Sequence, residues 1–385
     1  MKTKSRIYNT IIAILCQHRK YWLDIRHLFT LAWMVVGLIK SEKISIPAWI
    51  PYVESRAQYA QSTQRRFQRW IYNERINVHE LYAPLIQQAL SEWGNHKLYL
   101  ALDTSMLFEK YCLIRISVIF RGRAVPLAWK VMEHKSSTVA YDVYEGLLDA
   151  AALLLPKGVK VILLADRGFA DTKLMRHSTK LGWHFRIRIK CNFLVYHEGI
   201  YRNVDEFPLR HGEAIFLNNV SITWDRYGPL HLALAFSPDS KERWYVASDE
   251  PVSMETFHEY GLRTDIEENF LDDKSNGFQL ESSEIRSAEG LERLCMVIAL
   301  ATLYLVSQGA KVVEQDKRRL VDPHWFRGIS YLKIGWRWVK SALDKGWRLC
   351  RRLRLTGERD PEPAISSLRS KHLSSYIDVV SINST

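Results

Sequence analysis

Residues 159–166 read VKVILLAD, and five apolar residues follow one another without interruption before Asp166. A continuous apolar run of this length is typical of a β-strand that is buried on both faces, as in a parallel sheet covered by helices. Pro156 and Gly158 lie just before the run and end the helical pattern that precedes it. The stretch therefore predicts a central strand that ends in a carboxylate.

The segments on either side of this strand predict the sheet around it. A helical pattern at 137–155 separates it from three earlier strand-like segments, which are 97–103 (KLYLALD), 111–120 (YCLIRISVIF) and 124–131 (AVPLAWKV). A helix at about 171–182 and a strand at 183–190 follow it. This order predicts an α/β fold with a mixed sheet, in which an antiparallel meander is joined to parallel strands by crossover helices.

The chain between residues 191 and 310 completes this central domain, which we place at 96–310. Residues 191–250 are strand-like with short turns, so we interpret them as a β-rich insertion that ends at the strand RWYVASD. Two helices are expected after the insertion, at 252–274 and at about 287–309.

The two ends of the chain carry its positive charge. The 385 residues have a formal net charge of +12, and residues 1–95 and 311–359 have net charges of +7 and +9, so the rest of the chain is slightly acidic. We expect a helical DNA-binding domain at 1–95 and a basic, aromatic, helical C-terminal region at 311–385, with a loose end after residue 360. A chain this basic is expected to bind a polyanion, although surface solvation by Lys and Arg is the alternative.

The stretch STQRRFQRWIYN, at 62–73, is the part of the N-terminal region most suited to DNA. Phe67, Trp70 and Ile71 have helical spacing and form one apolar face, whereas Arg65, Arg66 and Arg69 lie on the other faces. The pattern predicts either a DNA-contacting helix or a solvated surface helix.

Cysteine usage and hydropathy favour a reducing compartment and no membrane span. The five cysteines are scattered, without a C-x-x-C pair, so no zinc site is expected. The longest apolar runs, LFTLAWMVVGLI and LCMVIALATLYLV, are shorter than the roughly 20 residues that a membrane-spanning helix needs. We expect these runs to be buried helices, and the protein to be cytoplasmic.

Asp103 and Asp166 each follow an apolar strand, Asp103 in YLALDTS and Asp166 in VILLADRGF. A carboxylate at the end of a strand lies on a rigid element and reaches the sheet edge where ligand sites form. Each Asp could instead cap a turn or helix. Because the first and fourth strands of such a sheet are neighbours, the two carboxylates together predict a shared divalent metal.

The stretch YGLRTDIEENFLDDK, at 260–274, offers a third carboxylate. On one straight helix, Tyr260, Arg263, Glu267 and Lys274 fall within an arc of about 60° when each residue advances about 100°. An apolar stripe lies beside that arc, so the helix is able to pack on the sheet and aim its polar stripe at the sheet edge. Carboxylates around Mg²⁺ suit phosphoryl transfer, and the Arg and Lys of the arc suit phosphate binding.

These residues resemble the DDE transposases of bacterial insertion sequences. The spacing Y-x2-R-x3-E-x6-K, preceded by ALDTS and LADRGF, is similar to the cut-and-paste group whose RNase H-like core carries a β-strand insertion between the second Asp and the Glu. The resemblance covers roughly residues 97–309 and implies an RNase H-like fold.

The resemblance also implies an activity and its site. It implies that Asp103, Asp166 and Glu267 are catalytic ligands of Mg²⁺, with Mn²⁺ as an alternative. It implies cleavage at transposon end repeats, transfer of the strands into target DNA, a hairpin intermediate and a homodimer in a paired-end complex, inside a bacterial cell. Tyr260, Arg263 and Lys274 would then contact phosphates.

Trp244, in ERWYVASDEPV, matches a tryptophan that stacks on a flipped base in this family. Stacking is a physically reasonable role for an aromatic ring beside an extruded base. The alternative is a core tryptophan in a strand.

Three other functions are compatible with parts of the sequence. A domesticated, non-catalytic DNA-binding protein on a transposase scaffold would retain the fold, and an RNase H-like nuclease would retain the carboxylates. His324, Arg327 and Tyr376 echo part of a tyrosine recombinase signature, but the matching upstream arginine context is missing.

Overall fold

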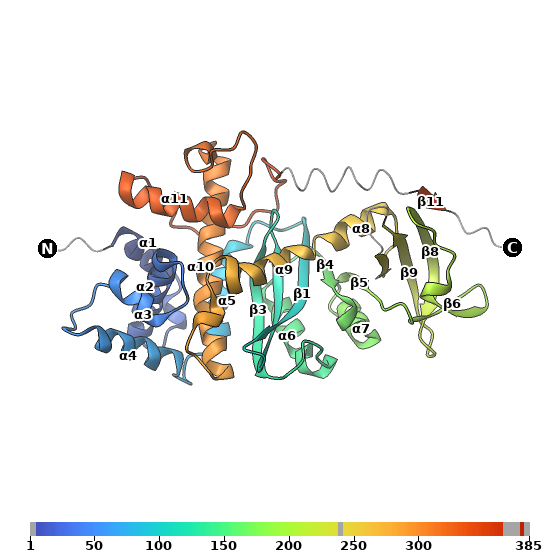
Figure 1. The fold of residues 1–385 in the computed structure, drawn as a ribbon, viewed down its shortest axis with the longest axis horizontal. Coiled ribbons are helices and arrows are strands. Elements are labelled where there is room, and N and C mark those ends of the chain that lie inside the picture. The colour runs from blue at the N-terminus through green and yellow to red at the C-terminus, as the bar shows by residue number, and fades with distance from the viewer. Residues whose placement is uncertain (1–4, 238–241, 365–377, 381–385) are drawn as a thin grey trace.

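The computed structural model describes residues 5–237, 242–364 and 378–380 (Figure 1). The N-terminal region is helical as expected, and its helices pack together at one end of the molecule, on the left in Figure 1. They are α1 (Arg6–Cys16), α2 (Ile25–Ser41), α3 (Ile46–Trp49), α4 (Ala60–Ile71) and α5 (Val78–Ala89). In α4, the predicted apolar face of Phe67, Trp70 and Ile71 is buried, because an amphipathic helix packs with its apolar face inward.

The central sheet has the predicted order. Its strands are β1 (Lys97–Leu107), β2 (Tyr111–Ile119), β3 (Ala124–Glu133), β4 (Lys160–Ala165) and β5 (His184–Arg188). They lie in the order β3-β2-β1-β4-β5. The first three pair antiparallel, and β4 is parallel to both β1 and β5. An antiparallel meander joined to parallel strands is the RNase H-like arrangement, so the predicted fold class is confirmed.

The β-rich segment extends this sheet rather than forming a separate one. Its strands are β6 (Leu194–His197), β7 (Ile200–Asn203), β8 (Glu213–Ile222), β9 (Tyr227–Phe236) and β10 (Arg243–Ser248). Strand β10 pairs antiparallel with β5 on one side and with β9 on the other. A short strand, β11 (Asp378–Val380), pairs parallel with β8. The ladder thus runs without a break from β3 to the far end of the molecule.

Two groups of helices cover the sheet. Helix α6 (Tyr141–Leu154) packs on β2 and β3 and contacts α7 (Thr172–Lys180), which packs on β5. Helix α8 (Met254–Gly261) packs on β5, β9 and β10, and α9 (Thr264–Leu271) packs on β1, β2 and β3. The last two helices therefore bring the sequence after the β-rich segment back to the strands that carry Asp103 and Asp166.

Helix α10 (Ala288–Glu314) stands between the N-terminal helices and the sheet (Figure 1). It continues beyond the predicted end at residue 309, because its apolar face includes the buried Val312 and Val313. By length and composition it could span a membrane, but 94% of its most apolar window is buried inside the molecule. It packs against α2, α5, β3 and the next helix, so it serves as a core element of the fold.

Helix α11 (Tyr331–Lys345) crosses α10 at very short distance. A Cβ atom on Gly309 would collide with the carbonyl oxygen of Tyr331, and one on Gly335 would collide with that of Leu305. These two glycines therefore allow the helix backbones to touch.

The chain after α11 returns to the N-terminal helices. The amide of Leu355 donates to the carbonyl oxygen of Ala89, and the Trp93 indole donates to that of Leu355. The carboxylate of Glu362 binds Arg318, so the segment just after residue 360, where we expected a loose end, is attached. Residues 365–377 and 381–385 of that expected loose end lie outside the described residues. The proposed domain limits remain predictions.

Candidate active site

The register of β1 and β4 places Asp103 beside Asp166. Leu102 of β1 lies opposite Ala165 of β4, so the next residue on each strand is an aspartate. The sequence prediction that the two aspartates are neighbours at one sheet edge is therefore confirmed. Asp103 is not the end of its strand, however, because β1 continues to Leu107 and stays paired with β2. Pairing between β1 and β4 ends at Leu102, the residue just before Asp103.

Helices α8 and α9 complete the cluster with an arginine, a tyrosine and a third carboxylate. The Arg263 guanidinium donates to Asp103 (Nη1 to Oδ2, 3.0 Å) and to Glu267 (Nη2 to Oε1, 2.7 Å). The Tyr260 hydroxyl donates to Asp166 (3.3 Å). The side chains of Asp103 and Arg263 are 17% and 10% exposed, whereas that of Glu267 is 51% exposed. The cluster is therefore a partly buried site that opens to solvent at Glu267.

The helix that carries this polar stripe is broken, contrary to prediction. Helix α8 ends at Gly261, and the backbone N–H of Arg263 donates to the carbonyl oxygen of Tyr260 before α9 starts at Thr264. Bonds of this kind span three residues rather than four and tighten the turn. A second irregularity, a π-helical turn at Asp272–Asn276, contains Lys274.

These irregularities affect the predicted members of the stripe differently. Tyr260, Arg263 and Glu267 still face the aspartates. The half-buried Lys274 does not join them, and its side chain forms no hydrogen bond or ion pair within the part of the chain that the structure describes. The four residues share an arc of about 60° only if the helix advances about 100° per residue throughout. The π-helical turn that contains Lys274 departs from this geometry.

Burial and like charges shape the electrostatics of the cluster. Burial raises the pKa of Asp103 to about 6. Arg263 and the Thr104 amide oppose this rise, while Glu267 and Asp166 add to it. Burial also raises the pKa of Tyr260 to about 12, so its hydroxyl keeps its proton at neutral pH. Burial alone would lower the pKa of Arg263, but Tyr260, Asp103 and Glu267 raise it overall.

A buried network fixes α8 in place, and the sequence analysis missed it. The Glu259 carboxylate, 4% exposed, accepts hydrogen bonds from Lys97 (3.0 Å), Tyr99 (2.9 Å) and Arg186 (2.8 Å). Glu259 immediately precedes Tyr260, so this network sets where the Tyr260 hydroxyl lies. A signal was present, since Lys97 and Tyr99 alternate with apolar residues and share one strand face with Asp103.

A second buried contact fixes the C-terminal side of α9. Arg115, which lies opposite Asp103 in β2, donates to Asp273 (2.5 Å) and to Asn269 (2.9 Å). Both partners of this ion pair are 1% exposed. Burial lowers the pKa of Arg115, but Asp273 and Cys295 together outweigh this effect and the pKa is raised. The segment from Glu259 to Asp273 is thus held at both ends.

Trp244 lies beside the cluster, on β10. Its ring is half-buried and meets the Tyr260 ring edge-on at a centroid distance of 5.4 Å. The guanidinium of Arg188 lies 5.9 Å from the Trp244 ring and is held by Glu242. Arg188 was missed in the sequence, although it alternates with Arg186 in FRIRIK and so shares its strand face. The stacking role of Trp244 remains a prediction.

Helix α4, which carries the predicted arginines, lies among the N-terminal helices on the left of Figure 1, apart from β1, α8 and α9. Arg65 and Arg69 are exposed, and Arg66 is half-buried. Arg66 and Arg69 line a cavity of about 1320 Å³ together with Arg26 and Arg56. Two nitrogens of Arg66, Nε and Nη2, are buried without a hydrogen-bond partner. Asp24 and Glu54 also line this cavity, so it carries both charges with an excess of arginine, and it is separate from the carboxylate cluster.

The donor chemistry of the carboxylate cluster suits a divalent cation, but the resting arrangement is not that of a formed metal site. Asp103, Asp166 and Glu267 are hard oxygen donors of the kind that Mg²⁺ prefers. Within the described residues, no group of three or more His, Cys, Asp and Glu side chains is arranged to hold a metal ion. Instead, Arg263 lies between Asp103 and Glu267, and its buried Nε has no hydrogen-bond partner.

The residues that echo a tyrosine recombinase have structural roles. Arg327 is buried and donates to Asp360 (3.1 Å) and to the carbonyl oxygen of Ile329. His324 binds the buried Asp322. Tyr376 lies outside the described residues. These contacts give no support to the recombinase alternative.

Comparisons with known proteins bear on the same part of the chain. Residues 115–304 match the model of a family described as Transposase DDE domain. This range starts after Asp103 and contains Asp166 and Glu267. Among solved structures, a piggyBac transposase in a synaptic complex with hairpin DNA is similar, with 11% identity and a TM-score of 0.44, over 99% of this chain and 84% of that chain. No curated protein matches significantly.

Proposed function

We propose that the chain cuts DNA at transposon ends and joins the 3′-hydroxyl ends to target DNA, because its residues 115–304 match the model of a family described as Transposase DDE domain. The observation that supports the proposal is that Asp103 lies beside Asp166 in the sheet while Arg263 links Asp103 to Glu267. Two strands and a helix from distant parts of the sequence contribute one carboxylate each.

The residues of the cluster have separate roles in this proposal. Mg²⁺, or Mn²⁺, held by Asp103, Asp166 and Glu267 would activate the attacking oxygen and stabilise the leaving one. Arg263, which neutralises Asp103 and Glu267 in the resting protein, would turn to a DNA phosphate when the carboxylates take up their ligand. Tyr260, protonated at neutral pH, would donate a hydrogen bond to a phosphate oxygen.

We also propose that the reaction passes through a DNA hairpin intermediate. Trp244 and Arg188 form a partly exposed aromatic and cationic pair next to Tyr260. An extruded base stacked on the Trp244 ring would leave the strand bent at the cluster. Lys274 would contact the DNA backbone from the π-helical turn after α9, since its side chain has no partner among the described residues.

DNA and a second copy of the chain are the proposed partners. The N-terminal helices, with Arg65, Arg66 and Arg69, and the basic C-terminal region would hold the duplex through its phosphates. Two ends must meet for transposition, so a homodimer in a paired-end complex is proposed. The location would be the bacterial cytoplasm, on the nucleoid.

The test is cleavage of DNA that carries the ends of the parent element, with Mg²⁺ present. Asp103→Asn, Asp166→Asn and Glu267→Gln should each cut at least about 10²–10³-fold more slowly but still bind end DNA. Glu145→Gln, an exposed carboxylate on α6, is the matched control and should cut normally. If any of the three variants cuts as fast as the parent, that residue is not a ligand.

A non-catalytic DNA-binding protein is the second candidate, favoured by one observation. Arg263 occupies one carboxylate oxygen of Asp103 and one of Glu267 in the structure, where a metal ion would otherwise bind. A protein of this kind would bind end DNA but would not cut it with Mg²⁺ or Mn²⁺. An RNase H-like nuclease would cut without joining the products to target DNA.

A further inference from the structure

The loop between α10 and α11 exposes two adjacent aromatic side chains. Trp325 is 79% exposed and Phe326 is 67% exposed, and Leu320 nearby is 56% exposed. The loop stands above α11, at the top of Figure 1. Neighbouring large apolar side chains that remain in water mark a surface where another molecule binds.

The backbone beneath these rings is held firmly by Arg318. This side chain is 2% exposed. Its guanidinium donates to Asp322 (3.0 Å), to both carboxylate oxygens of Glu362 (2.7 and 3.0 Å), and to the carbonyl oxygens of His324 (2.9 Å) and Trp325 (3.0 Å). All of its donor nitrogens are therefore used to fix the loop.

Two further buried side chains complete this support. Asp322 is fully buried and accepts hydrogen bonds from the backbone amides of His324 and Gly328, each at 3.2 Å. Arg327 reaches Asp360 and the carbonyl oxygen of Glu362 on the returning chain. The aromatic pair is thus presented by a preformed loop. A preformed surface loses little conformational entropy when it binds.

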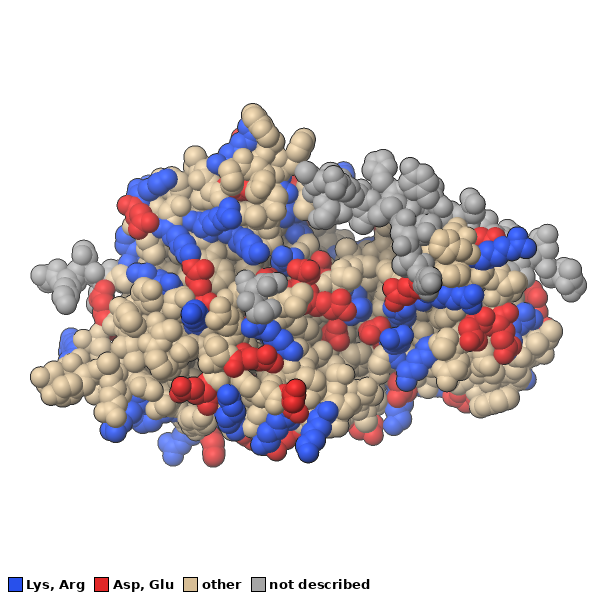
Figure 2. Space-filling view, in the orientation of Figure 1, with Lys and Arg blue, Asp and Glu red and all other residues tan. Residues whose placement is uncertain are grey.

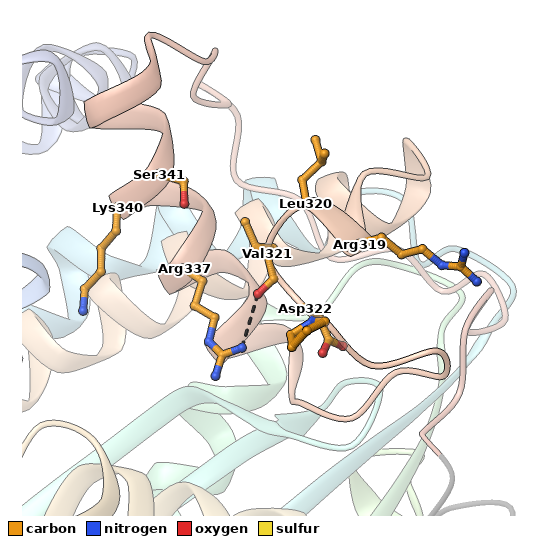
Figure 3. A pocket seen from close by; sticks show the side chains of 8 residues that line it. Arg319, Leu320, Val321, Asp322, Arg337, Lys340 and Ser341 are labelled. Atoms are coloured by element: carbon orange, nitrogen blue, oxygen red, sulfur yellow. Dashed lines mark hydrogen bonds between the residues drawn. The ribbon is translucent and has the colours of Figure 1, made fainter.

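The surroundings of the rings are cationic. The Arg319 guanidinium lies 5.1 Å from the Trp325 ring. Arg319, Arg337 and Lys340 line a hollow of about 360 Å³ beside the loop, in which Arg337 donates to the carbonyl oxygen of Val321 (Figure 3). Asp322, which also borders the hollow, is already neutralised by Arg318. Figure 2 shows Lys and Arg side chains gathered over α11 on the same side of the molecule.

We propose that the loop at 319–326 is a DNA-contact element. The rings of Trp325 and Phe326 stack on unpaired or unstacked bases, while Arg319 binds a neighbouring phosphate. Lys340, which is paired with Glu42 in the resting protein, exchanges that partner for a second phosphate. Aromatic rings beside cations are the combination that binds single-stranded nucleic acid without sequence preference. A second copy of the chain fits less well, because two copies meeting here would bring like charges together. The inference deepens the proposed function by adding a contact far along the chain from the carboxylates.

The experiment compares binding of a labelled duplex with an internal single-stranded gap and of the same duplex without a gap. The double variant Trp325→Ala/Phe326→Ala should bind the gapped duplex about tenfold more weakly, since base stacking contributes about 1–3 kcal/mol per base. Its affinity for the intact duplex and its salt dependence should stay close to those of the parent. Leu153→Ala, which removes an 80% exposed side chain on α6, is the control and should change neither.

Two more variants separate stacking from charge. Trp325→Phe/Phe326→Tyr keeps the rings and should restore binding of the gapped duplex. Arg319→Gln/Lys340→Gln should reduce the slope of log affinity against log salt by about 1–2, because each phosphate contact contributes about 0.9.

Three outcomes bear on the idea differently. Equal binding of the gapped duplex by parent and double alanine variant overturns it. Loss of self-association in sedimentation, with DNA binding intact, also overturns it and makes the loop a protein interface. If the parent binds the gapped duplex through the loop but never cuts end DNA, the proposed function fails and the loop assignment stands.

Discussion

The carboxylate cluster and the α10–α11 loop are both organised around an arginine, but the two arginines are used in opposite ways. Arg318 in the loop is 2% exposed and directs every donor nitrogen to a fixed acceptor. Arg263 in the cluster is 10% exposed, and its Nε is buried without a partner. Arg318 therefore uses all its donors within the fold, whereas Arg263, which faces the carboxylates, keeps a donor that a ligand could use.

The difference extends to what each region exposes. The cluster surrounds its arginine with acidic groups, and burial, with smaller contributions from Glu267 and Asp166, keeps the pKa of Asp103 raised in spite of Arg263. The loop neutralises its acidic groups and leaves aromatic rings in water. The contacts of Arg318 with Asp322 and Glu362 form what we call the loop clamp. We therefore expect substitutions in the loop clamp to reduce stability and substitutions in the carboxylate cluster to reduce activity.

Arg318→Ala should produce the largest change. It removes the guanidinium paired with the fully buried Asp322, which keeps only its contacts with His324 and the Gly328 amide, and loss of a buried ion-pair partner costs about 3–5 kcal/mol of unfolding free energy. Chemical denaturation of the two proteins measures the difference. Arg319→Ala, the exposed neighbour, should stay within about 0.5 kcal/mol of the parent. Equal losses in both variants would refute the distinction between a saturated and an exposed arginine.

Arg263→Gln should act on activity more than on stability. Loss of a cation that binds phosphate in the reaction should slow end cleavage about 10²-fold, or about 2.7 kcal/mol. Because Arg263 lowers the pKa of Asp103, the acidic limb of the pH–rate profile should move to higher pH. Arg176→Gln, an exposed arginine on α7, is the charge-matched control. An unchanged pH profile would show that Arg263 does not control Asp103 in the working enzyme.

Asp103→Asn should stabilise the protein when chelator is present and abolish cleavage when metal is present. The folded-state pKa of about 6 lies above the ordinary 3.8, so the folded protein binds the proton more tightly than the unfolded chain does. The stability contributed by this proton is fully present below about pH 4 and is lost as the pH rises through about 6. At pH 7.5 the variant should exceed the parent by about 1–2 kcal/mol, which is below the limit of about 2.7 kcal/mol that a two-unit shift sets.

Denaturation at several pH values tests this expectation. The gap between variant and parent should close as the pH falls toward 4. A variant that is less stable than the parent at every pH would show that Asp103 contributes favourable pairing with Arg263, and that the cluster resembles the loop clamp after all.

Much of the fold was accessible from local sequence patterns. The apolar run before Asp166 and the alternating strands before it determine which segments pair, and two aspartates on adjacent strands follow from that pairing. The break in the polar helix was harder to predict, because helical periodicity assumes an unbroken helix. Gly261, just before the break, was the available signal.

Contacts between distant segments were not accessible. Nothing local links Arg115 with Asp273 or Arg318 with Glu362, since each pair forms only after the sheet and the C-terminal region have folded together. The exposure of Trp325 and Phe326 could not be predicted from the sequence either, because large aromatic residues are usually expected in the core. The buried contacts that hold the carboxylate cluster and the α10–α11 loop in place are therefore visible only in the structure.

The smallest expected effect belongs to Glu259→Gln, which tests whether support of the cluster matters for chemistry. Glu259 does not touch the carboxylates but fixes Tyr260 through Lys97, Tyr99 and Arg186. A small displacement of Tyr260 should lower kcat about tenfold or less and leave KM nearly unchanged. Glu255→Gln, on the exposed face of the same helix, should alter neither.

A change in KM alone would mean that Glu259 supports DNA binding rather than placement of Tyr260. Loss of stability without loss of kcat would make Glu259 equivalent to Asp322 in the loop, a buried acid that serves the fold only. The expected result, a lower kcat in a protein of nearly parental stability, would show that the rigid sheet transmits position to the cluster.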